Sequence, residues 1–139
     1  MLFRSELGER VGIATSLNNL GDVATCLHDY VSAQTLYTES LALFHELGDR
    51  SGMAYCLEGL ASASATDAPV PAASLWGASE RLREELGSPL SPTERSDQEQ
   101  RVTAARAALG EAAFATAWAA GRALPLEQVI ALALESKIL

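Results

Sequence analysis

Apolar residues recur along the chain at the spacing of an α-helix. Intervals of four and three residues separate the members of one set: Ile13, Leu17, Leu20, Ala24 and Leu27. Such intervals place side chains on one face of a helix, because one turn takes about 3.6 residues. The pattern therefore predicts a first amphipathic helix over residues 10–26.

The same spacing predicts three further helices before residue 88. The second covers residues 30–47 and is followed by Gly48, which suits the left-handed conformation that often ends a helix. The third covers residues 50–64. The fourth covers residues 72–86, after a turn that contains Pro69 and Pro71. The prolines are expected to end one helix and to open the next.

The segment after Gly87 has a different pattern. Ser91 stands before Pro92 and three residues before Glu94, which is the signature of a capping box at the start of a helix. We expect a charged helix over residues 92–109, a short alanine-rich helix over 111–121, and a last helix opened by Pro125. Residues 88–139 are thus predicted to form a C-terminal helical cap.

One stretch of the chain occurs almost twice. Residues 46–54 read ELGDRSGMA, and residues 6–14 read ELGERVGIA, at an offset of 40 residues. Self-similarity at a period of about 20–50 residues indicates stacked helical repeats. We expect repeats over residues 1–87, with unit one at 9–48 and unit two at 49–87. Residues 1–8 are expected to be the end of a helix from a preceding repeat.

Composition narrows the function classes. The chain has 139 residues and a net charge of −8, and it lacks a basic stripe that could bind nucleic acid or anionic membranes. No apolar run reaches the roughly 18 residues that a membrane span requires. The two cysteines form no disulfide framework, and no secretory signal opens the sequence. We expect a cytoplasmic protein without nucleic-acid or membrane contacts.

The residues that could carry chemistry form no catalytic or metal-binding pattern. Cys26 and His28 lack a second ligand pair, and we expect Cys26 and Cys56 to fill the core. Five charged residues of the fourth helix are expected to form a solvated face: Glu80, Arg81, Arg83, Glu84 and Glu85. Trp76 and Trp118 lie in apolar stripes, so we expect them to pack between helices. No cofactor and no catalytic residue is predicted.

The helix pairs resemble tetratricopeptide repeats in a longer, 40-residue form. The resemblance rests on the spacing of Leu17, Leu20, Gly21, Ala24, Ala33, Tyr37 and Ser40. It implies that the paired helices cross at Gly21, that Ala33 packs back on this glycine, and that Tyr37 fills the interface. Unit two departs from the pattern because Ala61 replaces the glycine.

Three segments carry a narrower resemblance, at residues 46–54, 73–83 and 114–124. They are similar to the C-terminal region of bacterial LuxR-type and signal-transduction ATPase regulators. The chain has no Gly-rich phosphate loop and no basic recognition helix, so neither nucleotide hydrolysis nor DNA binding carries over. What the resemblance implies is the sensing or scaffolding array alone.

This fold type suggests a binding surface on the concave side, lined by the first helix of each pair. The candidate residues are Thr15, Asn18, Asp22, Thr25, Tyr55, Glu58 and Ser62. Asn18 and Asp22 lie one turn apart and could bind a peptide backbone. The surface lacks basic residues for a peptide carboxylate, which Glu58 is expected to repel.

We therefore expect an all-α solenoid of helix pairs that acts without catalysis, as a protein-interaction or effector-sensing module of a bacterial transcriptional regulator. Its partner would be a protein or peptide. Two alternatives stay open. One is a stand-alone adaptor that forms a homodimer through its N-terminal edge. The other is a helical domain that binds a small molecule.

Overall fold

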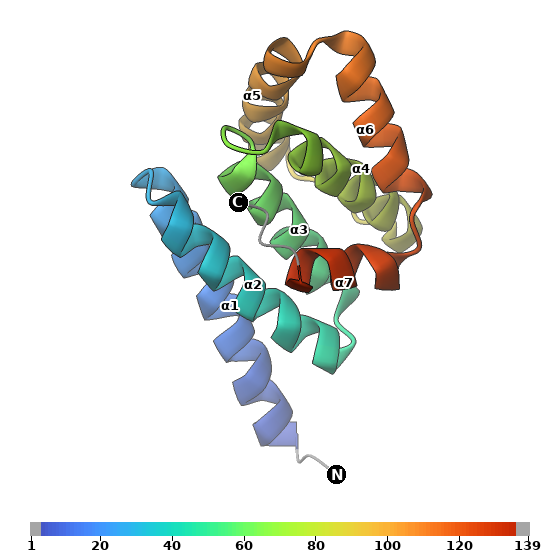
Figure 1. Ribbon diagram of the computed structural model, residues 1–139. Helices are drawn as coiled ribbons and strands as arrows, with labels where there is room; N and C mark the ends of the chain where they lie inside the picture. Colours follow the sequence, from blue (N-terminus) through green and yellow to red (C-terminus); the bar gives the residue numbers. More distant parts are fainter. Residues whose placement is uncertain (1–3, 136–139) are drawn as a thin grey trace.

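The computed structural model describes residues 4–135, and all its regular elements are α-helices (Figure 1). The helices are α1 (Arg4–Cys26), α2 (Tyr30–Leu47), α3 (Arg50–Ser64), α4 (Pro69–Leu86), α5 (Pro92–Leu109), α6 (Glu111–Ala123) and α7 (Leu126–Glu135). Helices α1 to α4 pack side by side in chain order, as in a helical-repeat solenoid. The predicted all-α class is confirmed.

Polar caps set the bounds of α2 and α3. Asp29 accepts a hydrogen bond from the Ser32 backbone N–H, which satisfies one free donor at the start of α2. Gly48 ends α2 at φ 70°, in the left-handed region. Asp49 then caps α3 by accepting from the Gly52 N–H at 3.0 Å. Both predicted ranges are confirmed.

The prediction that residues 1–8 end a separate helix is wrong where the structure describes them. Helix α1 begins at Arg4 and continues through Gly8 without a break. The counterpart of the helix-capping Asp49 is Glu9, and glutamate is not among the residues favoured at this cap. No cap interrupts α1 at this point, so the helix runs on. Residues 1–3 lie outside the described residues.

Two other helix ends differ slightly from the expectation, whereas the starts of α5 and α7 agree with it. Helix α4 begins at Pro69, earlier than predicted, because proline is well tolerated in the first turn, where its missing N–H would have no partner. Helix α6 extends to Ala123, and α7 begins just after Pro125. The predicted capping box of α5 is confirmed, since Ser91 and Glu94 each bond the other's backbone N–H.

Tyr37 of α2 fills the space between α1 and α3. A Cβ atom at Gly21 of α1 would lie 2.7 Å from its ring, and a Cβ at Gly59 of α3 would lie closer still. Both helices can therefore approach this ring only because these two residues lack a side chain. The expected crossing at Gly21 is confirmed, and Ala33 is fully buried.

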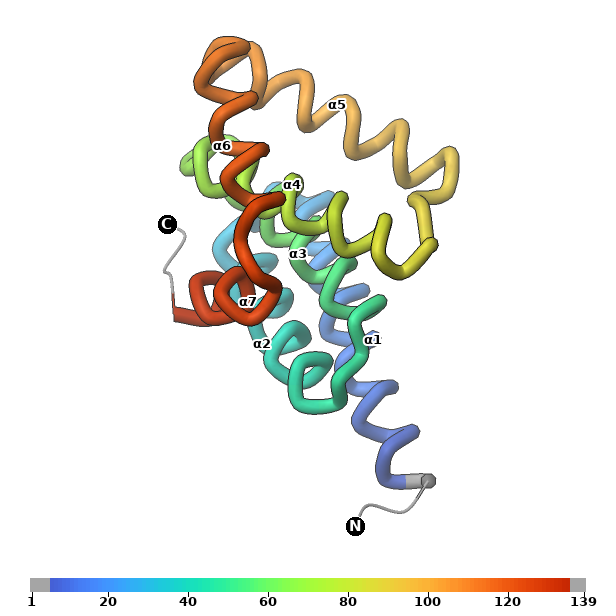
Figure 2. Tube along the Cα trace, turned by 90° about the vertical axis from the view of Figure 1, so that its right-hand side faces the viewer, coloured from blue at the N-terminus to red at the C-terminus, as the bar shows by residue number. Residues whose placement is uncertain are grey.

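Helices α4 and α6 make a second close contact, although α5 separates them in sequence. A Cβ at Gly77 would collide with the backbone of Trp118, and a Cβ at Gly121 with the backbone of Ser74. Helix α5 spans one edge of the molecule, well apart from α7 (Figure 2). Helix α7 packs on α2 and α4.

The apolar stripe predicted for the first helix lies mostly in solvent. Ile13, Leu20 and Leu27 are exposed, whereas Ala24 of the same stripe is buried against the rest of the chain. Helix α2 covers the neighbouring face of α1, which carries Ala14 and Gly21. The stripe thus marks an outer surface of the described chain.

We expect Gly59→Ala to lower the free energy of unfolding by about 1–3 kcal/mol, because the added methyl overpacks against the Tyr37 ring. Gly8→Ala is the matched control, since nothing lies within 4 Å of its Cβ position. It should stabilise α1 by up to about 1 kcal/mol. Urea unfolding followed by circular dichroism measures both. A stabilising Gly59→Ala would contradict this packing.

Candidate functional site: a polar groove beneath helix α5

A polar groove separates α5 from the first helices of the two predicted repeats. One cavity of about 290 Å³ lies among α1, α3 and α5, and a second of about 660 Å³ lies between α4 and α5. Both cavities border Glu58, Leu90 and Gln98. They therefore form two adjoining parts of one groove under α5.

Most of the residues predicted as a binding surface meet at this groove. The smaller cavity is bordered by six of them: Asn18, Asp22, Thr25, Tyr55, Glu58 and Ser62. Thr15 is exposed on α1, closer to the N-terminus, and borders neither cavity. Its inclusion in the site is therefore not supported by the geometry.

No signal in the sequence indicated that α5 would form one wall of the groove. Glu94, Asp97, Gln98 and Arg101 of this helix border the smaller cavity. Only two residues of α5, Val102 and Ala105, are buried. A helix with so small an apolar face carries little information about its position in the fold.

Asp22 joins the groove to the helix crossing beneath it. The Tyr37 hydroxyl donates to Asp22 Oδ1 at 2.6 Å and lies 3.3 Å from the Thr25 hydroxyl. Desolvation raises the pKa of Asp22, although the bond from Tyr37 and the charge of Arg101 oppose this shift. Burial and the neighbouring Asp22 raise the pKa of Tyr37, so the phenol stays neutral.

A buried ion pair closes the other side of the groove. The Arg83 guanidinium donates two hydrogen bonds to the Glu58 carboxylate, from Nε to Oε2 and from Nη2 to Oε1 at 2.8 Å, and both side chains are buried. Arg83 also donates to the Ser88 carbonyl at 3.0 Å and lies 4.7 Å from the centre of the Tyr55 ring. The Glu58 carboxylate raises the pKa of Arg83, whereas desolvation raises that of Glu58.

This ion pair corrects two expectations. Arg83 does not belong to a solvated face, because it turns inward to a carboxylate on α3. Glu58 does not present a free negative charge to a ligand, because Arg83 neutralises it. The local charge pattern of α4 could not indicate either point, since the partner lies 25 residues away.

The two cysteines have different environments. Cys56 is fully buried, accepts from Asn18 Nδ2 at 3.6 Å, and donates to the Ser40 hydroxyl at 3.2 Å. Burial raises the pKa of this thiol to about 11, so it stays protonated at neutral pH. The core placement of Cys56 is confirmed. That of Cys26 is wrong, because this residue ends α1 and is exposed beside the groove.

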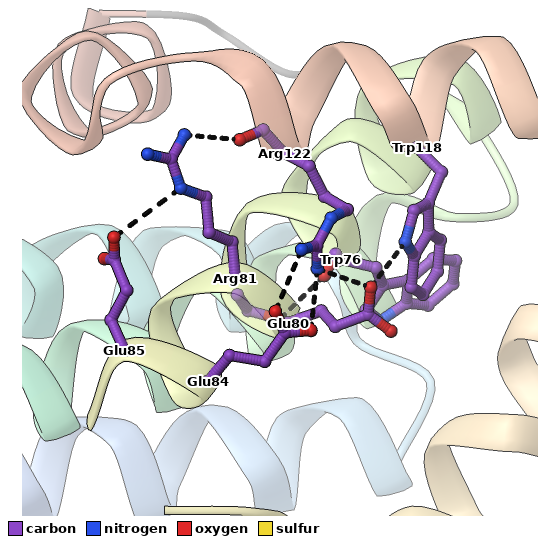
Figure 3. Close-up of polar contacts among 8 residues, drawn as sticks. Trp76, Glu80, Arg81, Glu84, Glu85, Trp118 and Arg122 are labelled. Atoms are coloured by element: carbon purple, nitrogen blue, oxygen red, sulfur yellow. Dashed lines mark hydrogen bonds and ion pairs between the residues drawn. The ribbon is translucent and has the colours of Figure 1, made fainter. Parts of the chain in front are cut away.

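Three of the remaining charges of α4 bond α6, whereas Glu85 pairs with Arg81 of its own helix (Figure 3). Arg122 of α6 pairs with Glu80 at 2.7 Å and with Glu84 at 2.9 Å, and Trp118 Nε1 donates to Glu80 at 3.0 Å. Arg81 donates to the Arg122 carbonyl. Glu80, Arg81, Glu84 and Glu85 are all exposed, so the expected solvated face is confirmed for these four residues, although part of it also contacts α6. The packing expected of the tryptophans is confirmed, with Trp76 buried and Trp118 joining α6 to α4.

Within residues 4–135, no group of three or more histidine, cysteine, aspartate or glutamate side chains is arranged to hold a metal ion. None of the helices in this range is both long and apolar enough to cross a membrane.

Arg83→Met should lower the free energy of unfolding by about 3–5 kcal/mol, because it leaves the buried Glu58 carboxylate unpaired. Arg81→Met on the same helix is the control, and its exposed contacts predict a loss below about 1 kcal/mol. Adding Glu58→Gln to Arg83→Met should recover part of the loss. Chemical denaturation at neutral pH measures all three. Equal losses for the two single variants would contradict the assignment.

Asp22→Asn should change how stability depends on pH. The pKa of Asp22 is raised above its ordinary 3.8, so the folded state holds this proton more tightly than the unfolded state does. The contribution of protonated Asp22 to the stability of the fold is therefore present in acid. It is lost as the pH rises through the pKa that Asp22 has in the folded state. The asparagine variant lacks this loss, so its stability relative to the parent should increase from about pH 4 to pH 7. Urea midpoints across this range measure the difference, and a decrease would contradict the shift.

Comparison with protein-family models, curated proteins and solved structures finds no match for this chain.

Proposed function

We propose that the chain is a non-catalytic interaction module, whose groove beneath α5 binds a segment of a partner protein. The single observation that supports this most is the meeting of six predicted surface residues, from two repeat units, around one polar cavity. The resemblance noted from the sequence further suggests tetratricopeptide-type units in a cytoplasmic bacterial regulator.

The charges at the groove favour a basic partner segment. Asp22, Glu94 and Asp97 border the smaller cavity, and Arg101 is the only cation among its lining residues. Glu58 is left out of this balance because Arg83 neutralises it. An excess of carboxylates attracts lysine and arginine side chains and repels acidic ones.

The groove offers donors and acceptors, and two buried nucleophilic groups, Tyr37 at its border and Cys56 in the adjoining core, are kept neutral. Burial disfavours the thiolate of Cys56 and the phenolate of Tyr37. Asn18 is nearly buried and already donates to Cys56, so it contributes less to a ligand than the sequence suggested. These features support recognition in which neither Cys56 nor Tyr37 acts as a nucleophile.

The test compares two labelled peptides of equal length, identical except that lysines in one replace glutamates in the other. Fluorescence anisotropy should show binding of the lysine peptide, which added salt should weaken. The double variant Asp22→Asn/Asp97→Asn should lose at least about tenfold in affinity, equivalent to about 1.4 kcal/mol. Equal affinity for both peptides would overturn the proposal.

A matched control separates the groove from the overall charge. Glu39→Gln/Asp67→Asn changes the net charge equally, at exposed residues outside both cavities. This control should keep the affinity within about twofold of the parent. A loss equal to that of the groove variant would assign the effect to long-range attraction.

The cavity between α4 and α5 favours a small-molecule effector as a second candidate. Its volume of about 660 Å³ lies within the usual range of ligand sites, about 300–1,000 Å³. Gln98 borders both parts of the groove, so Gln98→Trp should fill it. A metabolite that raises the melting temperature of the parent but not of this variant would support the second candidate.

A further inference from the structure

The exposed face of α1, defined by Gly12, Ile13, Leu17, Leu20 and Val23, has a buried counterpart in the same chain. We infer that this face is a repeat interface, and that its occupant is a further antiparallel helix pair, placed on α1 as α1 and α2 are placed on α3. This face lies on the outer side of α1 and borders neither cavity of the groove.

The 40-residue offset relates α1 to α3 residue by residue. Three pairs show the contrast in exposed fraction: Ile13 and Met53 (54% and 4%), Leu20 and Leu60 (53% and 1%), and Val23 and Ala63 (54% and 2%). Helix α3 is covered on this face because α1 and α2 pack against it. Most positions of the corresponding face of α1 are also apolar, yet nothing in the described chain covers it.

A pair of glycines identifies the side chain that should cover this face. Gly52 of α3 lies directly under the Phe44 ring, which leaves no room for a Cβ atom. Its counterpart Gly12 has nothing within 4 Å of its Cβ position. Glycine in a helix interior costs about 0.5–1 kcal/mol relative to alanine. A close approach by an aromatic ring explains this glycine at position 12 as it does at 52.

The face of α2 that covers α3 cannot come from a second folded copy. Tyr37, Leu41 and Phe44 are buried within their own chain. In a symmetric dimer this face would meet the α1 face of the second copy, and α1 contains no aromatic residue to lie on Gly12. A separate α2-like helix therefore fits this face better than a homodimer does.

One difference between the units specifies the occupant further. Tyr37 lies over Gly59, and the counterpart of Gly59 is the exposed Asn19. A tyrosine at the same place on the occupant would meet the Asn19 side chain. We therefore expect its helix to carry a large aromatic residue over Gly12 and a residue smaller than tyrosine beside Asn19.

The test extends the full chain by one of its own units. A copy of residues 9–48 is inserted before residue 9, with Glu9→Asp in the original unit to cap α1 and Asn19→Gly to receive the copied Tyr37. A cysteine replaces Ile13 of the original unit, with Cys26→Ser in both units, so that the only other thiol is the fully buried Cys56. We expect the thiol at position 13 to react at least tenfold more slowly than in the unextended chain. A cysteine at the remote, exposed Glu39 of the original unit is the control and should react equally in both. An unchanged rate at position 13 would overturn the inference.

Gly12→Ala should shift the urea midpoint of unfolding in opposite directions in the unextended and the extended chain. In the unextended chain the methyl meets no atom, so the urea midpoint should rise. In the extended chain the same methyl meets the copied Phe44, so the midpoint should fall. A rise in both chains would count against the inference.

A second measurement tests the inference without the extended chain, in case that chain does not fold. A helix-stabilised peptide of residues 30–48 is added to the unextended chain that carries the thiol at position 13. Protection by this peptide, but not by its Phe44→Ala form, would support the inference, and no protection would overturn it. Protection that instead grows with the concentration of the unextended chain, together with a dimer in sedimentation, would show that a second copy occupies the face.

Discussion

The contact of the Tyr37 ring with Gly21 and Gly59 is the constraint on which the other features depend. It fixes how closely α1, α2 and α3 approach, because neither glycine position can accept a side chain. The same residue extends to the groove, where its hydroxyl bonds Asp22. The packing of the core and the position of a groove carboxylate are thus set by one side chain. A change that moves this ring would alter both together.

The Glu58–Arg83 pair has a similar double role in the second unit. It joins α3 to α4, and its contact with the Ser88 carbonyl also holds the loop that leads to α5. Helix α5 itself buries only Val102 and Ala105, so its own packing provides little to position it. The loop and the capping box at Ser91 therefore matter for the placement of the groove wall. A buried charged pair needs such dense bonding to offset its loss of hydration.

The sequence was sufficient wherever the signals were local. Asp29, Gly48 and Asp49 predicted the ends of α2 and α3, and the repeat spacing selected six residues that meet at the groove. It was insufficient where partners are distant, as for Arg83 and for the wall formed by α5. The run of α1 through Gly8 was missed for another reason. The 40-residue offset aligns Gly8 with Gly48, which ends α2. However, a helix ends only where capping residues and neighbouring helices favour its end.

The backbone contact between α4 and α6 assigns folding and recognition to different residues, whereas in many proteins the same residues must serve both. Helix α6 packs directly on α4 through Gly77 and Gly121. The intervening helix α5 is therefore an insertion on which this contact does not depend. Substitutions along the groove-facing side of α5 can accumulate at little cost to folding. Descendants of such a scaffold could change what they recognise by varying one helix, while the crossing that supports it stays constant.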